Sequence, residues 1–456
     1  GKPFLHLEVD EHSADAGMVT RIEAFLDSLE GSEKNAKKSI EVIRPRPSPS
    51  SPPANRTLYF PYMHDGALFV AAAARSVGIP SEVLPPQTEE DIALGRKYTS
   101  SKECFPMICT TGSFLRKLRE PGADPSKMSF FMPDHNGPCR FGQYNQFQRI
   151  LFDRLGYTDA ELITPSNDTS YADLAGDRSQ RFRINAWKGF VAFDYIRKLY
   201  RETRPYELHK GDSEAVYRRA LKKAEASIEN NSRGLRRILV ETASEFTAVA
   251  TDRSHRKPVI AVLGEIFMRD NATCNGNIAN RLEALGAEVL VGPFSEWITY
   301  STHRYTRDSR WKNDTKGLIK SKIQGIGQEV IVDYLLRGIK KVSDTSKDVS
   351  LHEILKLSNR YVSEFYDGDP PIALGMSSAL AERGVSGIAA ILPFTCMPGT
   401  LIASVSDSFR KDHNNIPFLN IPYDGQDSVS LETRLQAFFF QVREYAEAHQ
   451  QVSSHQ

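Results

Sequence analysis

The sequence predicts an α/β protein with two lobes, each built on a parallel sheet whose faces are covered by helices. Short runs rich in Val, Ile and Leu alternate with segments of helical periodicity, and this alternation occurs in two sets along the chain. The composition is that of an ordinary globular protein, with 456 residues, 40% of them hydrophobic and 25% charged. Strands that alternate with helices indicate parallel pairing, since a helix must carry the chain back between strands.

The first set opens with an apolar run at 58–63. A helical segment at 67–76 and a short strand at 81–84 follow it. Another strand is expected at 128–132, with a helix over 141–155 behind it.

The second set repeats this arrangement. A helix is expected over 277–285, where Gly286 supplies a residue that ends helices readily. The charged segments 166–256 and 294–365 have helical patterns, and we interpret them as helical additions to the two lobes. Buried strands are expected at 258–263, 288–291, 385–392 and 416–421.

The N-terminal region differs from the rest. Residues 31–57 contain too much proline and serine to fold and should form an extended, semi-rigid linker. Residues 3–10 and 20–25 resemble 417–424 and 433–438, and each copy has the pattern of a strand, a polar loop and an amphipathic helix. The expected organisation is therefore a closing strand–helix element of a preceding similar domain (1–30), the linker (31–57), a first lobe with its helical addition (58–256), a second lobe with its addition (257–445) and a polar tail (446–456).

Charge and motifs exclude several classes of function. With 58 basic and 57 acidic side chains, the net charge of +1 argues against nucleic-acid binding through bulk electrostatics. The basic positions within 218–237 alternate with Ala and Leu, as on a solvated helix face. Nucleotide loops, zinc-ligand motifs and serine nucleophile elbows are absent from the sequence.

We also expect no membrane partner and a cytoplasmic location. No apolar run reaches the roughly 18 residues that a membrane-spanning helix needs. The first four residues show neither the charged nor the apolar region of a signal peptide.

Three of the five cysteines lie at the expected end of a strand or start of a helix. Cys104 directly precedes the helical segment 107–118, Cys139 lies between a strand and its helix, and Cys396 follows a buried strand. Parallel sheets bind ligands outside the carboxyl ends of their strands, and helix N-termini stabilise thiolates. Three thiolates from two lobes suit a [4Fe–4S] cluster in which one iron has no cysteine ligand.

Each cysteine alone also fits a buried small hydrophobe. Cys109 lies inside the expected helix and is interpreted as packing, and Cys274 is the weakest spare ligand. Glu265 and Arg269 follow a buried strand and are candidates for the cleft, although a Glu–Arg pair that holds the loop fits as well.

Two histidines are further candidates. His135, near Cys139, and His64, at the end of the first strand, titrate near neutral pH and would suit proton relay. Loop histidines are more often structural.

Residues 102–106, 137–144 and 264–271 resemble the 2-hydroxyacyl-CoA dehydratase D-component family. More closely, they are similar to the long fused proteins known as acyl-CoA dehydratase activase-related proteins or CoA-substrate-specific enzyme activases. The resemblance covers most of 58–445 and implies two flavodoxin-like lobes with a [4Fe–4S] cluster in the cleft between them. By position, its ligands would be Cys104, Cys139 and Cys396.

The resemblance also implies a function in anaerobic metabolism. In the dehydratases, an ATP-hydrolysing activator passes one electron to the cluster, and the electron serves radical chemistry on an acyl-CoA thioester. The activator's nucleotide motifs are missing here, so we expect the electron-accepting half, with the activator as a separate partner or fused upstream.

The chain would then be a lyase or reductase component. Nothing in the sequence shows a CoA pocket. Two alternatives therefore stay open: an electron-transfer or scaffold module that binds no acyl-CoA, and a double-cubane type of ATP-dependent small-molecule reductase with a larger cluster. A homodimer and a heterodimer are equally compatible with the sequence.

Overall fold

The computed structural model describes residues 5, 7, 15–32, 47–100, 102–135, 137, 139–166, 171, 173–339, 342–343, 348–425 and 429–453. The chain divides into two units, Gly1–Arg46 and Pro47–Gln456. In the first unit, helix α1 (Asp15–Ser32) contains the helical part of the expected closing element. The strand expected at 3–10 lies outside the described residues except for Leu5 and Leu7.

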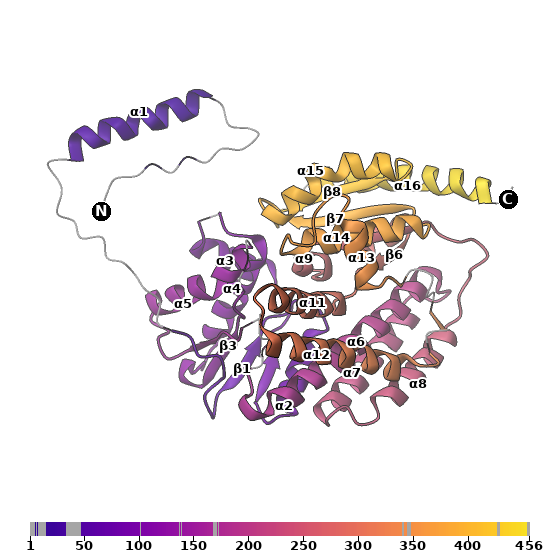
Figure 1. Ribbon diagram of the computed structural model, residues 1–456, viewed down its shortest axis with the longest axis horizontal. Coiled ribbons are helices and arrows are strands. Elements are labelled where there is room, and N and C mark those ends of the chain that lie inside the picture. The colour runs from indigo at the N-terminus through magenta and orange to yellow at the C-terminus, as the bar shows by residue number, and fades with distance from the viewer. Residues whose placement is uncertain are drawn as a thin grey trace. The chain divides into compact units, whose positions relative to one another are not determined.

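The second unit contains two four-stranded parallel sheets with the same strand order. Figure 1 shows strands of the first sheet in purple and strands of the second in orange. The order is β2-β1-β3-β4 in the first sheet and β6-β5-β7-β8 in the second, which is the order of flavodoxin-like sheets without a fifth strand. This confirms the predicted fold class of two α/β lobes. The strands are β1 (Thr57–Phe60), β2 (Ser81–Val83), β3 (Met128–Phe131), β4 (Glu161–Ile163), β5 (Val259–Gly264), β6 (Glu288–Val291), β7 (Gly387–Pro393) and β8 (Phe418–Tyr423).

Strand β4 was not predicted from the sequence. β4 has three residues and pairs with β3, with Leu162 opposite Phe130. A three-residue segment shows little periodicity, and its pairing with β3 places it at the edge of the sheet.

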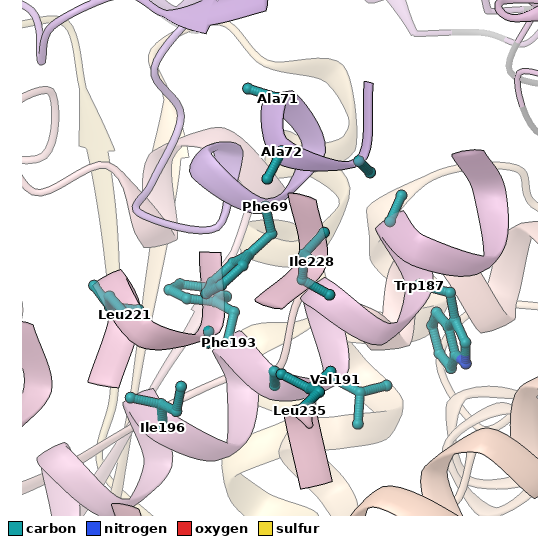
Figure 2. Close-up of a cluster of buried hydrophobic side chains, with 14 of the residues drawn as sticks. Phe69, Ala71, Ala72, Trp187, Val191, Phe193, Ile196, Leu221, Ile228 and Leu235 are labelled. Atoms are coloured by element: carbon teal, nitrogen blue, oxygen red, sulfur yellow. The ribbon is translucent and has the colours of Figure 1, made fainter. Parts of the chain in front are cut away.

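Helices cover both sheets. In the first lobe they are α2 (Ala67–Arg75), α3 (Glu89–Tyr98), α4 (Phe105–Leu118), α5 (Tyr144–Arg154), α6 (Ser179–Thr203), α7 (Asp212–Glu229) and α8 (Leu235–Thr247), with short 3-10 turns η1 (Pro125–Lys127), η2 (Arg140–Gln143), η3 (Gly176–Arg178) and η4 (Arg204–Tyr206). The core of the helical addition lies where α2 meets α6, α7 and α8 (Figure 2). Phe69, Phe193 and Leu221 are buried there, and removal of such side chains from water is the main stabilising contribution.

The second lobe carries α9 (Ile266–Asp270), α10 (Ile278–Leu285), α11 (Ser295–Trp311), α12 (Thr315–Leu336), α13 (Leu351–Ser358), α14 (Asp369–Glu382), α15 (Met397–Asp412) and α16 (Val429–Ser453). Within the range expected to serve this lobe, α12 crosses over and packs on α6 and α8 (Figure 1). Leu335, at its C-terminal end, and Ile339 enter the core of the first lobe. A helix of the second addition therefore forms part of the core of the first. Among the described residues, no helix combines the length and the apolar character needed to cross a bilayer.

The expected linker is only partly described. Residues 33–46 lie outside the described residues, whereas residues 47–56 run along the first lobe. The amide of Thr164 donates to the Pro49 carbonyl (2.9 Å), the Ser51 hydroxyl donates to the Leu174 carbonyl (2.7 Å), and Arg56 donates to the Met128 carbonyl (3.1 Å).

Close helix pairs recur at equivalent places in the two lobes. α3 packs on α4 just before β3, and α13 packs on α14 just before β7. Gly112 and Gly375 allow this approach, because a Cβ atom would lie 1.8 Å from the Asp91 carbonyl oxygen and 2.0 Å from the Ile354 carbonyl oxygen, respectively.

Gly375→Ala should therefore destabilise the protein by about 1–3 kcal/mol, since α13 must move away from α14. Gly325→Ala on α12 is the matched control, because its Cβ meets only a methyl group of Thr302 at 3.9 Å. It should be neutral or stabilising by up to about 1 kcal/mol. Denaturant unfolding of the full chain measures both. Equal stability of the two variants would contradict the close-packing argument.

Candidate functional site

Three cysteines begin three helical segments. Cys104 is the N-cap of α4, Cys139 is the N-cap of η2, and Cys396 is the N-cap of α15. All three have extended backbone conformations and free thiols. Pro106 and Pro398 stand two residues after the first and the last of them, where a proline is compatible with the first helical turn. These three residues are called the site cysteines below.

The two lobes contribute to the site in an equivalent way. Cys139 follows β3 and Cys396 follows β7, and these strands have the same place in the two sheets. Parallel strands end on one edge of a sheet, which is where open α/β folds bind ligands. The sequence-based expectation for these positions at the strand ends agrees with the structure.

One guanidinium links the three cysteine-bearing loops. Arg140 follows the second site cysteine directly, and its Nη1 donates to the Lys102 carbonyl (2.6 Å). Its Nη2 donates to the Thr395 carbonyl (2.5 Å) and to the hydroxyl of the same residue (3.3 Å). Lys102 lies just before the first site cysteine and Thr395 just before the third. Arg140 therefore connects the two lobes beside the site cysteines.

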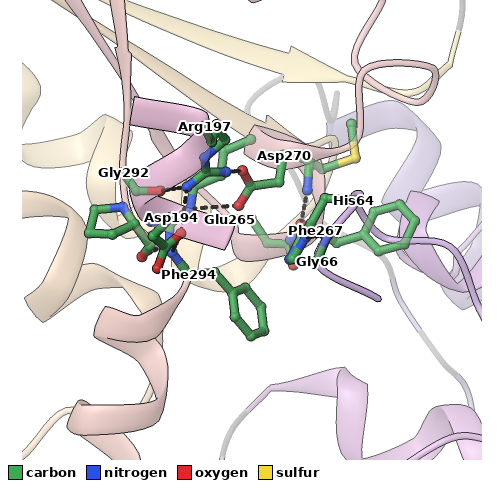
Figure 3. Close-up of polar contacts among 12 residues, drawn as sticks. His64, Gly66, Asp194, Arg197, Glu265, Phe267, Asp270, Gly292 and Phe294 are labelled. Carbon is green, nitrogen blue, oxygen red and sulfur yellow. Dashed lines mark hydrogen bonds and ion pairs between the residues drawn. The ribbon is translucent and has the colours of Figure 1, made fainter. Parts of the chain in front are cut away.

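The carboxyl group of Glu265 lies close enough to influence all three thiols, and burial raises its own pKa above the ordinary value. Glu265 is the N-cap of α9, and its oxygens accept the amide hydrogens of Phe267 (3.1 Å) and Met268 (2.9 Å) (Figure 3). Burial raises the pKa of each site cysteine, and the charge of Glu265 raises it further. For Cys139 the pKa rises to about 12.

The site thus holds three buried or half-buried thiols next to a carboxylate. As thiolates they would need a compensating positive charge, which bound iron supplies. Among the described residues, no three His, Cys, Asp or Glu side chains are close enough to coordinate a single metal ion. A [4Fe–4S] cluster does not require such a set, because each thiolate binds a different iron atom. The donor chemistry therefore fits a cluster.

Three further polar residues belong to this region, and sequence reasoning did not select them as candidates. Tyr144, buried at the start of α5, hydrogen-bonds Cys104. Burial and the charge of Glu265 raise the pKa of Asp369, at the start of α14, to about 8. Burial likewise raises the pKa of Glu296, on α11, to about 8. For Asp369 the sequence offers one indication of such a place, because two prolines follow this residue, as at the start of a helix.

A narrow pocket lies beside Asp369, lined also by Gly264, Arg269, Trp297, Ile372 and Ala373. Arg269, a predicted site residue, is buried there, and its guanidinium donates to the Pro293 carbonyl (3.0 Å). Its Nε lies 3.5 Å from the carboxylate of Asp270. Arg269 therefore holds the loop after β6, while both oxygens of Glu265 are engaged by backbone amides.

A second arginine joins the two lobes in this region (Figure 3). Arg197, on α6 of the first lobe, pairs with Asp270 of the second lobe and with Asp194 (3.1 Å), and it donates to the Gly292 carbonyl (2.8 Å). Asp194 in turn accepts the amide hydrogen of Phe294 (2.9 Å) at the start of α11.

The two candidate histidines have different surroundings. His135 is buried in the loop after β3, with its ring centroid 6.0 Å from that of Phe141. His64 is stacked on Phe193 (4.6 Å between centroids) and accepts the amide hydrogen of Gly66 at Nδ1 (2.9 Å). Burial, with Arg197 nearby, lowers the pKa of His64 well below its ordinary value, so its ring is neutral at physiological pH.

The remaining two cysteines meet each other. Cys109 and Cys274 are both fully buried, and their sulfur atoms lie 3.2 Å apart across the boundary between the lobes. The packing role expected for Cys109 fits this position. Its thiol pKa is raised well above the ordinary value by burial and by Cys274. Sequence spacing could not reveal this pair, because the two residues are 165 positions apart.

No model of a known protein family matches the chain, and no curated protein is significantly similar to it in sequence. The site is therefore interpreted from its own geometry.

The buried Glu296 carboxyl should make stability depend on pH. Its pKa in the folded protein, about 8, lies above its ordinary value of 4.5, so the folded state holds the proton more tightly. This contribution is complete below pH 4.5 and is lost as the pH rises towards 8. Glu296→Gln should therefore stabilise the protein at pH 8 by an amount on the order of 1–3 kcal/mol, and much less at pH 5.

Denaturant unfolding at both pH values measures this difference. Glu241→Gln is the control, since Glu241 is exposed on α8 and its change should be small at either pH. A Glu296→Gln effect that is the same at pH 5 and pH 8 would contradict the prediction.

Proposed function

We propose that the second unit is an iron–sulfur module in which Cys104, Cys139 and Cys396 hold a [4Fe–4S] cluster between the lobes. The observation that carries the proposal is the link between the three cysteine loops. Arg140 donates hydrogen bonds to backbone carbonyls in the loops before the other two cysteines, and this links the three cysteine-bearing loops of the two lobes.

The likeness of the two lobes supports an open coordination position. α4 precedes β3 as α14 precedes β7, and each helix has a proline two residues after its N-cap. Cys104 caps α4, whereas Gly368 caps α14 and is followed by Asp369. The fourth equivalent position thus has no thiol. One iron would lack a cysteine ligand and could take water or a substrate oxygen.

The cluster, when bound, would supply one-electron reduction. The chain's own residues would provide the surroundings for it. Tyr144 donates a hydrogen bond to Cys104, the helix N-termini favour negative charge, and burial excludes water. Asp369, with a pKa of about 8, would be protonated at neutral pH and able to give a proton to a departing hydroxyl group.

We further propose that the module accepts a low-potential electron from an ATP-hydrolysing activator. It would use this electron in reductive radical chemistry on a CoA thioester, as a lyase of the 2-hydroxyacyl-CoA dehydratase type. The narrowness of the pocket beside Asp369 favours a second candidate, a module that relays electrons and binds no acyl-CoA.

Anaerobic reconstitution tests the cluster. The wild-type chain should bind about four iron atoms with matching sulfide. Cys104→Ala, Cys139→Ala and Cys396→Ala should each lose most of them, because each removes one of the three ligands. Cys274→Ala is the matched control and should retain the cluster, since that thiol contacts Cys109 instead. Full iron content in Cys139→Ala, or its loss in Cys274→Ala, would contradict the ligand assignment.

The reconstituted chain also distinguishes the three proposed functions. A shift of the cluster's EPR signal on addition of an acyl-CoA supports the lyase. Rapid reduction by an activator without such a shift supports electron relay. An iron count well above four per chain would instead indicate a double-cubane type of reductase.

The role of Arg140 can be tested apart from the ligands. Arg140→Lys keeps the charge but replaces the two donor nitrogens that serve the Lys102 and Thr395 carbonyls with one nitrogen on a shorter side chain, so at least one of these hydrogen bonds should be lost. Iron loss to a chelator should be about tenfold faster, as expected for one or two lost hydrogen bonds. Arg237→Lys on α8 is the control. Unchanged iron loss in Arg140→Lys would show that the loops hold together without this link.

A further inference from the structure

Helix α12 carries an apolar stripe on the side that faces away from the protein. Its inner face packs on the helices of the first lobe through residues such as Gln328 and Leu335, which are buried. The outer face carries four exposed aliphatic side chains: Ile319 (56% exposed), Ile323 (66%), Ile326 (63%) and Val330 (61%). Such a row of exposed β-branched residues marks an interaction surface.

The spacing of the stripe indicates the shape of its partner. Its members are four, three and four residues apart, which is the spacing of the a and d positions in a heptad. Side chains at these positions pack into the spaces between side chains of a second helix. The surface therefore fits an α-helix with the same apolar pattern.

The charged residues on α12 select the partner and its direction. Lys316 and Asp333 continue the heptad beyond the two ends of the stripe, and Lys322 and Glu329 flank it on one side. All four are exposed, and none has an ion-pair partner among the described residues. The N-terminal half of the helix is thus basic on this face and the C-terminal half acidic.

A second copy of α12 meets these demands in one orientation only. In an antiparallel pair with Ile323 opposite Ile326, Ile319 lies opposite Val330 and Lys316 lies opposite Asp333. The same register brings Lys322 beside Glu329 of the other copy. A parallel pair would set Lys316 against Lys316 and Asp333 against Asp333, which is unfavourable. We propose that two copies of this chain associate through an antiparallel α12–α12 pair about a twofold axis.

The helix is held firmly for this role. The indole of Trp187 donates to the Gln328 carbonyl (3.2 Å), and Arg183 donates to Gln324 on the same inner face. At the end of the stripe the Arg236 guanidinium lies over the ring of Tyr334 (5.8 Å). A surface that is already ordered loses little conformational entropy on association.

Sedimentation of the full chain over a range of concentrations tests the proposal. The wild type should be a dimer, and Ile323→Asp/Ile326→Asp should raise the dissociation constant by about 100-fold or more, because charges would face the centre of the pair. Leu208→Asp is the matched control, since Leu208 is 60% exposed in the connection before α7 and should not affect the dimer. Thermal unfolding checks that all variants are folded.

Two outcomes overturn the proposal: a wild type that stays monomeric at the highest concentration, and a dimer that survives the double substitution. The orientation has its own test. Oxidised mixtures of Ile319→Cys and Val330→Cys should cross-link between copies, whereas either variant alone should not. Cross-linking of Ile319→Cys with itself would indicate a parallel pair and contradict the proposal.

Charge reversal supplies an independent check that does not depend on cysteine chemistry. Lys322→Glu should weaken the dimer, and the additional change Glu329→Lys should restore it. Failure of the second change to restore the dimer contradicts the proposed register.

Discussion

The arrangement of the two lobes depends on the buried guanidinium of Arg197. It pairs with Asp270 of the second lobe and Asp194 of its own helix, and it donates to the Gly292 carbonyl. A buried charge is costly unless it is paired and hydrogen-bonded, so these contacts hold α6 against the loops after β5 and β6. Asp194 extends this constraint to the start of α11. The pocket beside Asp369 is lined in part by Gly264 and Arg269, which belong to the end of β5 and the segment that follows it.

Two sheets of one topology, held in this way, bring equivalent loops together. Cys139 and Cys396 each follow the third strand of a lobe, and Arg140 joins their loops by hydrogen bonds to backbone carbonyls. The likeness ends where Cys104 caps α4 but Gly368 caps α14. Because of this difference, three of the four equivalent positions hold a thiol, which supports the proposed open coordination position at the fourth.

Most of the strands and several of the site residues could be predicted from the local sequence pattern. Seven of the eight strands were predicted, and β1, β3, β5 and β7 are the nearly continuous apolar runs expected of strands buried on both faces. β2 was predicted although its sequence, Ser-Glu-Val, is not such a run, whereas β4, which is also three residues long, was not predicted. The site cysteines and Glu265 were found because they directly follow strands or precede helices. Tyr144, Glu296 and Asp369 were missed because they lie on helices and reach the site only through packing between distant segments.

The sequence by itself determined the order of the elements, the parallel character of the sheets and the positions of the thiols at strand and helix ends. Only the tertiary structure decided that Cys109 lies against Cys274, that α12 packs on the first lobe, and that Arg197 bridges the two lobes. The reason is physical. Periodicity along the chain determines which face of an element is apolar, but the segment that covers this face is decided by packing among residues far apart in the chain.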